Sequence, residues 1–354
     1  LRHFKTKMLK DKLTIILLIK GRPKFTQRWL TYANKYLKDL KIIVADGSEI
    51  KERYKISKES FPNIDLVLPE FPYDDKIETY QKKIQSSIYL TKTEYLCMMS
   101  NDDFILKESL EKIVEFLDEN KDYSCGRGDV YDFSINDINK KQSIYGDIYS
   151  IDKLFHSIGF KKKDTILRLK EFGNCPHGLW HCIVRKNIFK KAIQESLINK
   201  INNHQIFENF ITYYLIISGK VYFNKSLYLL HQKHKEMQTV GKNFESFYST
   251  IKKDILAYEN FINVLMRLIL TKNNLKNINE TKQILNNILT KRRTKVEVNK
   301  IESFFKNIRL LIFNILINHN HILFILVKLK TKIIPYNGEY KREINLIKSF
   351  LDYK

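Results

Sequence analysis

Two adjacent carboxylates, Asp102 and Asp103, are the residues of this sequence that most clearly suggest chemistry. They follow an apolar segment at residues 95–99 that has the length of a buried strand, and a helical pattern begins at Lys107. Carboxylates at the carboxyl end of such a strand lie where open α/β sheets bind ligands. Two of them repel each other unless a cation or a hydrogen-bond donor lies between them. Mg²⁺ or Mn²⁺ would suit the pair, and an Asp-rich turn that caps the next helix is the alternative.

Alternating strands and helices would position these carboxylates. Apolar runs predict strands at residues 13–19, 41–45 and 64–68 in addition to the strand at 95–99, and a helix at about 76–90 precedes the last of them. This alternation predicts an α/β fold with a mostly parallel sheet that helices cover on both faces. Polar groups follow three of these strands. They are Gly21 and Arg22 after the first strand, Asp46 after the second, and the Asp pair after the strand at 95–99. They should converge, because the ends of parallel strands meet at one edge.

On these residues the chain resembles the GT-A glycosyltransferases, specifically the family 2-like enzymes of bacterial surface polysaccharides such as capsule or lipopolysaccharide. The resemblance covers roughly residues 12–235 and rests on Asp46-Gly47-Ser48 and on Asn101-Asp102-Asp103. It implies a GT-A (Rossmann-like) fold that transfers sugar from a nucleotide-sugar donor to a glycan or lipid-linked glycan acceptor. It also implies a bound Mn²⁺ or Mg²⁺ ion.

The resemblance further assigns roles to the strand ends. Gly21 and Arg22 would belong to the loop over the nucleotide, and Asp46 would contact its base or ribose. Asn101 replaces the first acidic residue of the family motif, so a ribose contact is expected there. Asp103 would then hold the metal and the diphosphate, with Asp102 in support on the nucleotide side.

Glu208 is the candidate catalytic base, at the start of a predicted amphipathic helix. The resemblance places an acidic pair here whose second member is commonly the base, but that position is Asn209 in this chain. A carboxylate can take the proton of the attacking acceptor hydroxyl. Alternatively, Glu208 only favours the positive end of the helix.

Farther along the chain, His234 is preferred over His231 as the residue that would complete the metal site or contact the diphosphate. The alternative is that this segment is an ordinary solvated basic turn.

Two Cys and two His occur between residues 175 and 182, but their spacing does not form the paired knuckles of a zinc site. The resemblance instead implies an acceptor-side loop, in which His177 and Trp180 are candidate acceptor contacts. Trp can stack on a sugar ring, or it can be an ordinary core residue. The other two cysteines are scattered, which fits a reducing, cytoplasmic compartment.

The apolar run at 13–19 is too short for a secretory signal. The chain opens with Leu1, so Met8 or a non-standard start is expected to open the polypeptide.

The pattern changes at about residue 244, which predicts a catalytic domain at 12–243 and a helical, basic region at 244–354. Residues 310–327 contain no charged side chain, but polar residues at their centre argue against a membrane span. The flanking basic residues predict a peripheral surface for anionic lipid at the cytoplasmic face. The alternative is a helical appendage packed on the catalytic domain or on a twin subunit in a homo-oligomer.

The net charge of +23 leaves a nucleic-acid-binding protein as the rival from another class. Acidic residues are interspersed with basic ones in the first half and no recognised binding motif is present, so we expect no nucleic-acid partner. A nucleotidyltransferase is the enzyme alternative. A nucleotidyltransferase would require a Gly-rich basic loop after the first strand, and residues 20–23 contain only one glycine and two basic residues. A further alternative keeps the fold without catalysis, because Asn101 and Asn209 replace acids.

Overall fold

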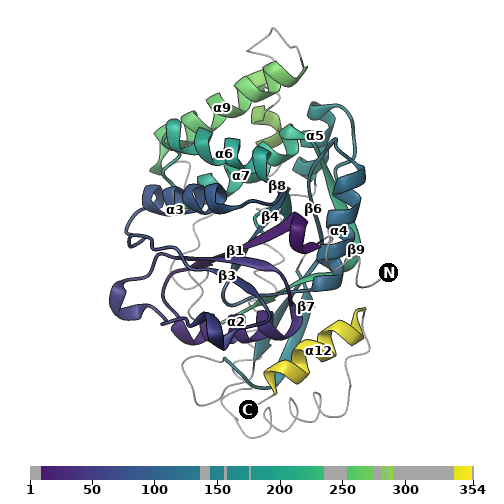
Figure 1. Ribbon diagram of the computed structural model, residues 1–354. Helices are drawn as coiled ribbons and strands as arrows, with labels where there is room; N and C mark the ends of the chain where they lie inside the picture. The colour runs from purple at the N-terminus through teal and green to yellow at the C-terminus, as the bar shows by residue number, and fades with distance from the viewer. Residues whose placement is uncertain are drawn as a thin grey trace, which may run out of the picture.

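One mixed sheet organises the chain, and helices flank both of its faces (Figure 1). The computed structural model describes residues 9–135, 144–154, 158–174, 177–234, 253–273, 281–283, 285–289 and 339–352. Within these ranges the strand order is β3-β2-β1-β4-β8-β6-β9-β5, with β7 paired to β6. The predicted α/β GT-A-like fold is therefore confirmed.

The first half contains the parallel strands that the sequence predicts. They are β1 (Leu13–Ile19), β2 (Lys41–Asp46), β3 (Asp65–Val67) and β4 (Tyr95–Ser100), with helices α2 (Pro23–Tyr36) and α3 (Ile77–Leu90) and the short helices η1 (Ile50–Glu52) and η2 (Lys58–Ser60) between them. The register pairs Ile19 with Asp46 and Leu18 with Ser100. The carboxyl ends of three strands thus meet at one edge, as expected.

The second half adds antiparallel pairs to the sheet. Its elements are β5 (Phe104–Ile105), α4 (Lys107–Glu119), β6 (Tyr123–Ile135), β7 (Ile148–Lys153), α5 (Thr165–Asn174), β8 (Ile183–Arg185), α6 (Lys186–Ile198), α7 (His204–Ser218) and β9 (Lys220–Gln232). Strand β9 runs parallel to β6 but antiparallel to β5, so that Phe104 pairs with Leu230. This pairing brings the end of β9 beside the residues that follow β4.

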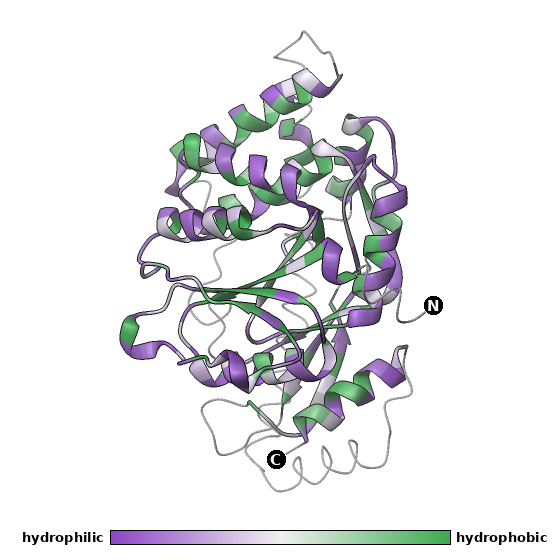
Figure 2. Ribbon diagram, viewed as in Figure 1, coloured by the Kyte–Doolittle hydropathy of each residue, from purple (hydrophilic) through white to green (hydrophobic). Residues whose placement is uncertain are grey.

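Apolar side chains on both faces of the sheet explain why its strands read as continuous hydrophobic runs. Along β1, Ile15 and Leu17 pack with α2 and α4, whereas Ile16 packs with α3 and the helices of the other face. Figure 2 shows the central strands mostly as hydrophobic and the helices as mixed. Strands buried on both faces cannot alternate polar and apolar residues.

The described helices of the C-terminal region pack on the sheet and on the helices that cover it. Helix α9 (Ile255–Asn273) lies against α7, and α12 (Lys341–Leu351) buries Phe350 against the rings of Tyr32 and Phe104. The proposed boundary at residue 243 stays a prediction. The apolar segment at 310–327 and the basic run at 291–295 lie outside the described residues. Within the described ranges, no helix combines the length and the apolar character that crossing a membrane requires.

Candidate functional site

The loops after β1 and β2 are tied together at the polar edge of the sheet. Gly21 and Arg22 both have left-handed backbones, with φ of 66° and 60°, which turns the chain sharply into Pro23 at the start of α2. The Gly21 amide donates to Ser48 Oγ at 2.6 Å, and the Ser48 amide donates to Asp46 Oδ1 at 2.8 Å. The three predicted nucleotide-loop positions, Gly21, Arg22 and Asp46, therefore lie within one connected set of loops.

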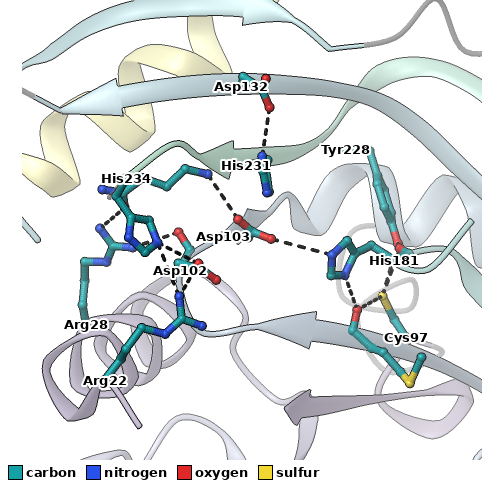
Figure 3. A network of polar contacts seen from close by, with 12 residues as sticks. Arg22, Arg28, Cys97, Asp102, Asp103, Asp132, His181, Tyr228, His231 and His234 are labelled. Atoms are coloured by element: carbon teal, nitrogen blue, oxygen red, sulfur yellow. Dashed lines mark hydrogen bonds and ion pairs between the residues drawn. The ribbon is translucent and has the colours of Figure 1, made fainter. Parts of the chain in front are cut away.

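Two basic side chains contact Asp102 directly (Figure 3). Its Oδ2 atom lies 2.5 Å from Arg22 Nη1 and 2.9 Å from His234 Nε2. Burial by itself would raise the pKa of Asp102, but the His234 hydrogen bond and the Arg22 charge outweigh it and lower the pKa below its usual value. Asp102 is therefore an ionised acceptor that joins the end of β4 to the loop after β1 and to the chain after β9.

Asp103 lies in a different environment, with only 1% of its surface exposed. Its Oδ1 atom accepts a hydrogen bond from the Gln232 backbone N–H at 3.2 Å, and its Oδ2 atom lies 3.8 Å from His181 Nε2. Burial raises the pKa of Asp103, although the nearby His231 and His181 oppose that shift. The metal role expected for Asp103 stays a prediction, and its carboxylate contacts the Gln232 backbone N–H of β9 and His181, whereas His234 contacts Asp102.

His231 faces a second carboxylate and does not share the contacts of His234. Its Nδ1 atom lies 2.9 Å from Asp132 Oδ1. Burial would lower the pKa of His231, but the charge of Asp103 and the hydrogen bond to Asp132 raise it to about 9. The preference for His234 over His231 stays a prediction; of the two, His234 is the residue that reaches Asp102.

Asn101 is fully buried and supports the start of α2. Its Nδ2 atom donates to Thr26 Oγ1 at 3.0 Å and approaches the Arg22 carbonyl at 3.4 Å. Its Oδ1 atom has no hydrogen-bond partner among the described residues. The ribose contact expected for Asn101 stays a prediction, and the visible role of this side chain is to hold the loop that carries Arg22.

A cavity of about 240 Å³ opens beside these loops. Its walls come from the ends of β1 and β4 and from the starts of α3 and α7, and they include Arg22, Ser100, Tyr80, Lys83, Asp74 and His204. Lys83 and Asp74 form a buried ion pair, which the sequence does not reveal. The Asp74 carboxylate packs on Gly47, where an added Cβ atom would lie 2.2 Å from it. Glycine in the Asp46-Gly47-Ser48 turn is therefore a steric requirement of this wall.

Glu208 lies near the start of α7, one turn after His204, which lines the cavity. Its Oε1 atom is 3.7 Å from His204 Nδ1, and about a third of the side chain (36%) remains exposed. Partial burial raises the pKa of Glu208 above its ordinary value, and His204 opposes the shift. A carboxyl group with a raised pKa beside a cavity suits a general base, but the catalytic role stays a prediction.

The two predicted acceptor contacts differ in position. Trp180 is half-buried, stacks on Tyr80 with ring centroids 6.4 Å apart, and thereby lies behind a wall of the cavity. His177 is 4% exposed and stacks on Phe160 at 5.3 Å, in the aromatic core beside Phe172. Both roles stay predictions, and the packing of His177 resembles that of a core residue.

The donor set at Asp102 and His234 is suitable for a divalent cation that a substrate would help to hold. Within the described part of the chain, no group of three or more His, Cys, Asp or Glu side chains could hold a metal by itself. Mg²⁺ is commonly bound by one or two carboxylates together with substrate phosphates. The Arg22 guanidinium on Asp102 shows that this carboxylate accommodates a positive group.

The segment considered for zinc contains Cys175 and Cys182. Cys182 is a buried free thiol, and Cys175 lies outside the described residues.

Comparison with known proteins is consistent with this architecture. A family model described as Glycosyl transferase family 2 matches residues 14–192. A crystal structure of S. aureus TarS 1–349 is similar, with 13% identity, a TM-score of 0.50, and coverage of 80% of this chain and 72% of that chain. The same fragment in complex with UDP-GlcNAc gives 16% identity, a TM-score of 0.47, and coverage of 80% and 73%. A longer TarS structure gives 13% identity and a TM-score of 0.44, with coverage of 79% of this chain and 43% of that one.

A search of curated proteins found no match. The residues that the family model matches make up half of this chain, and they cover β1 to β4, apart from Leu13, together with Asp46, Asp102 and Asp103. The fold, the converging strand ends and this match lead to one conclusion. The chain belongs to glycosyl transferase family 2.

Proposed function

We propose that the protein transfers a sugar from a nucleotide-sugar donor to a glycan acceptor of a bacterial cell-surface polysaccharide. The observation that carries the proposal is the meeting of Asp102, Arg22 and His234 at the ends of β4, β1 and β9. A nucleoside diphosphate leaving group carries negative charge that must be neutralised as the bond to the sugar breaks. This cluster offers a guanidinium and two candidate metal ligands for that purpose.

Mn²⁺ or Mg²⁺ would be held by Asp102 and His234, together with oxygens of the diphosphate, and would neutralise the leaving group. This assigns the metal to Asp102 in preference to Asp103, because Asp102 is the carboxylate that contacts His234. Arg22 would donate hydrogen bonds to the phosphates from the same edge. The connected loops of Gly21 and Asp46 would hold the base and the ribose.

Glu208 would act as the general base for the acceptor. The acceptor hydroxyl oxygen forms a bond to the anomeric carbon while the bond from that carbon to the diphosphate oxygen breaks, and the hydroxyl proton passes to Glu208. The nucleoside diphosphate leaves with the electron pair of the broken bond. The acceptor contact of Trp180 stays a prediction, since its ring stacks on Tyr80, which lines the cavity.

Binding of nucleoside diphosphates to the purified full chain tests the proposal. We expect UDP, GDP or another member of such a panel to raise the melting temperature, and the increase to be larger with Mn²⁺ than with a chelator. The corresponding sugar nucleotide should then be hydrolysed slowly or transferred to added glycan. Salt-dependent retention on duplex DNA without any nucleotide effect would instead favour the nucleic-acid-binding alternative. Pyrophosphate release from a nucleoside triphosphate would favour the nucleotidyltransferase.

We further propose that the basic C-terminal region brings the enzyme to the cytoplasmic face of a membrane, where a lipid-linked acceptor would be presented. The support is the run of basic residues at 291–295 in the sequence. Full-length protein should sediment with vesicles that contain anionic lipid, and this binding should weaken as salt is added. A variant with Gln at Lys291, Arg292, Arg293 and Lys295 should sediment less. Equal sedimentation of both proteins would contradict the proposal.

A further inference from the structure

Arg28 carries a buried guanidinium group behind the candidate site, without lining the cavity. It belongs to α2 and is 1% exposed. Its Nη2 atom donates to the backbone carbonyl of Asp102 at 2.9 Å, and its Nη1 atom donates to Gln232 Oε1 at 2.7 Å and to the Ile144 carbonyl at 2.8 Å. One side chain therefore links Asp102, two residues after β4, to Gln232, the last residue of β9.

These contacts close a ring between the two segments that supply the candidate metal ligands. Arg28 joins the Asp102 carbonyl to the Gln232 side chain, and the Gln232 backbone N–H donates to Asp103 Oδ1 at 3.2 Å. His234 follows Gln232 by two residues, and its Nε2 atom lies 2.9 Å from Asp102 Oδ2. The ring thus restrains the backbone on both sides of the Asp102–His234 pair.

Stacked rings extend the same restraint to the His234 side chain. The Arg28 guanidinium lies 4.8 Å from the Phe25 ring centroid and 4.7 Å from that of Phe104. The Phe25 ring in turn stacks on the His234 ring, with centroids 4.8 Å apart and an interplanar angle of 27°. Arg28 therefore supports His234 through Phe25 and supports Asp102 through its carbonyl.

A buried guanidinium is costly unless hydrogen bonds and opposite charges compensate for the lost water. Burial lowers the pKa of Arg28 to about 10, while Asp102 and Asp103 act in the opposite direction. The group thus remains charged at neutral pH. Its position between the Asp102 carbonyl and the end of β9 combines planar hydrogen bonding with charge, which a lysine cannot reproduce in full.

We propose that Arg28 is a positioning residue for glycosyl transfer, which sets the placement of Asp102 relative to His234 and thereby the affinity for the metal–diphosphate unit. The inference rests on the proposed function. It assigns to Arg28 no contact with the donor, the acceptor or the metal. Outer-shell partners of this kind typically change metal affinity or activity by about 10- to 100-fold when they are removed.

Three variants of the full chain test the proposal. Arg28→Met keeps length and apolar packing but removes the charge and the hydrogen bonds, and Arg28→Lys keeps the charge but not the planar fork of donors. Arg168→Met is the matched control. Arg168 is also a buried arginine, and it donates to the Ile216 and Ile217 carbonyls at the end of α7 remote from Glu208. Each protein is measured for melting temperature, for nucleoside diphosphate affinity with Mn²⁺ and with a chelator, and for kcat and KM.

We expect both Met variants to melt at lower temperature, because each loses buried hydrogen bonds. Only Arg28→Met should weaken nucleoside diphosphate binding in Mn²⁺, by about tenfold or more, with a much smaller change in the chelator. Arg28→Lys should recover part of the Mn²⁺-dependent affinity. If Arg28→Met does not fold, Arg28→Lys and Gln232→Leu provide the comparison, and each should weaken Mn²⁺-dependent binding more than Arg168→Met does.

The coupling of Arg28 to Gln232 gives an additional readout. Residues that act through one shared network show non-additive effects, so Gln232→Leu should add little to the loss of affinity in Arg28→Met. Wild-type affinity in folded Arg28 variants, or an equal loss in Arg168→Met, would overturn the proposal. If the wild-type protein binds no nucleoside diphosphate at all, the proposed function itself fails, and this inference fails with it.

Discussion

Asp102→Asn is expected to lower kcat/KM by about a hundredfold or more, because it removes the charge that would hold the metal and orient Arg22. The amide has the size of the carboxylate, and its oxygen can still accept a hydrogen bond from Arg22. The chain should therefore fold. Steady-state kinetics and nucleoside diphosphate affinity, each titrated with Mn²⁺, measure the effect. The dependence on Mn²⁺ should be lost together with the activity.

The matched control is Asp103→Asn, at the neighbouring and more deeply buried carboxyl group. Its main contacts are the Gln232 backbone N–H and His181, so the substitution should lower the melting temperature but leave most of the response to Mn²⁺. The pair of variants distinguishes the two possible metal ligands. If Asp103→Asn removes the Mn²⁺ response and Asp102→Asn retains it, the ligand is Asp103, as the sequence resemblance implies.

The lowered pKa of Asp102 also gives a prediction for stability against pH. A carboxyl group with a lower pKa in the folded state stabilises the protein above its unfolded pKa, and that stabilisation is lost as pH falls through the folded pKa. In Asp102→Asn this acid-sensitive contribution should be absent. Chemical denaturation of the wild type and the variant across acidic pH measures the difference. Parallel stability curves for the two proteins would contradict it.

Glu208→Gln is expected to reduce turnover by about a hundredfold or more while donor affinity stays nearly unchanged. Glutamine keeps the shape of the side chain but cannot accept the proton of the acceptor hydroxyl. Because burial raises the pKa of Glu208, the wild-type rate should rise with pH through a value above the ordinary range for glutamate. The variant should lack that rise.

His204→Gln provides the companion to this experiment. His204 opposes the upward shift in the pKa of Glu208, so its removal should move the rising part of the pH–rate profile to higher pH. An unchanged pH–rate profile in His204→Gln would show that His204 does not influence the pKa of the catalytic base. If Glu208→Gln instead abolishes donor binding, Glu208 belongs to the nucleotide site and another group is the base.

The sequence by itself determined the first half of the fold and the edge where the site lies. Apolar runs of strand length predict β1, β2 and β4, because strands that helices cover on both faces need continuous hydrophobic side chains. The polar residues that end these runs, such as Asp46 and Asp102, had to converge because parallel strands end at the same edge. The helix from residue 107 follows from its own periodicity. These features depend on local pattern, which sequence shows directly.

Only the tertiary structure decided which of these residues face one another. Asp102 and Asp103 are neighbours in the chain, yet one reaches Arg22 and His234 and the other turns toward Gln232 and His181. No local pattern distinguishes them.

The partnership of Asp102 with His234 joins residues 132 positions apart and depends on the antiparallel pairing of β5 with β9. In the sequence, Arg28 is one of the polar residues of an amphipathic helix. Its contacts with Asp102 and Gln232 form only when α2 packs beside the ends of β4 and β9. The sequence thus located the chemistry at an edge, and long-range pairing selected the side chains that can perform it.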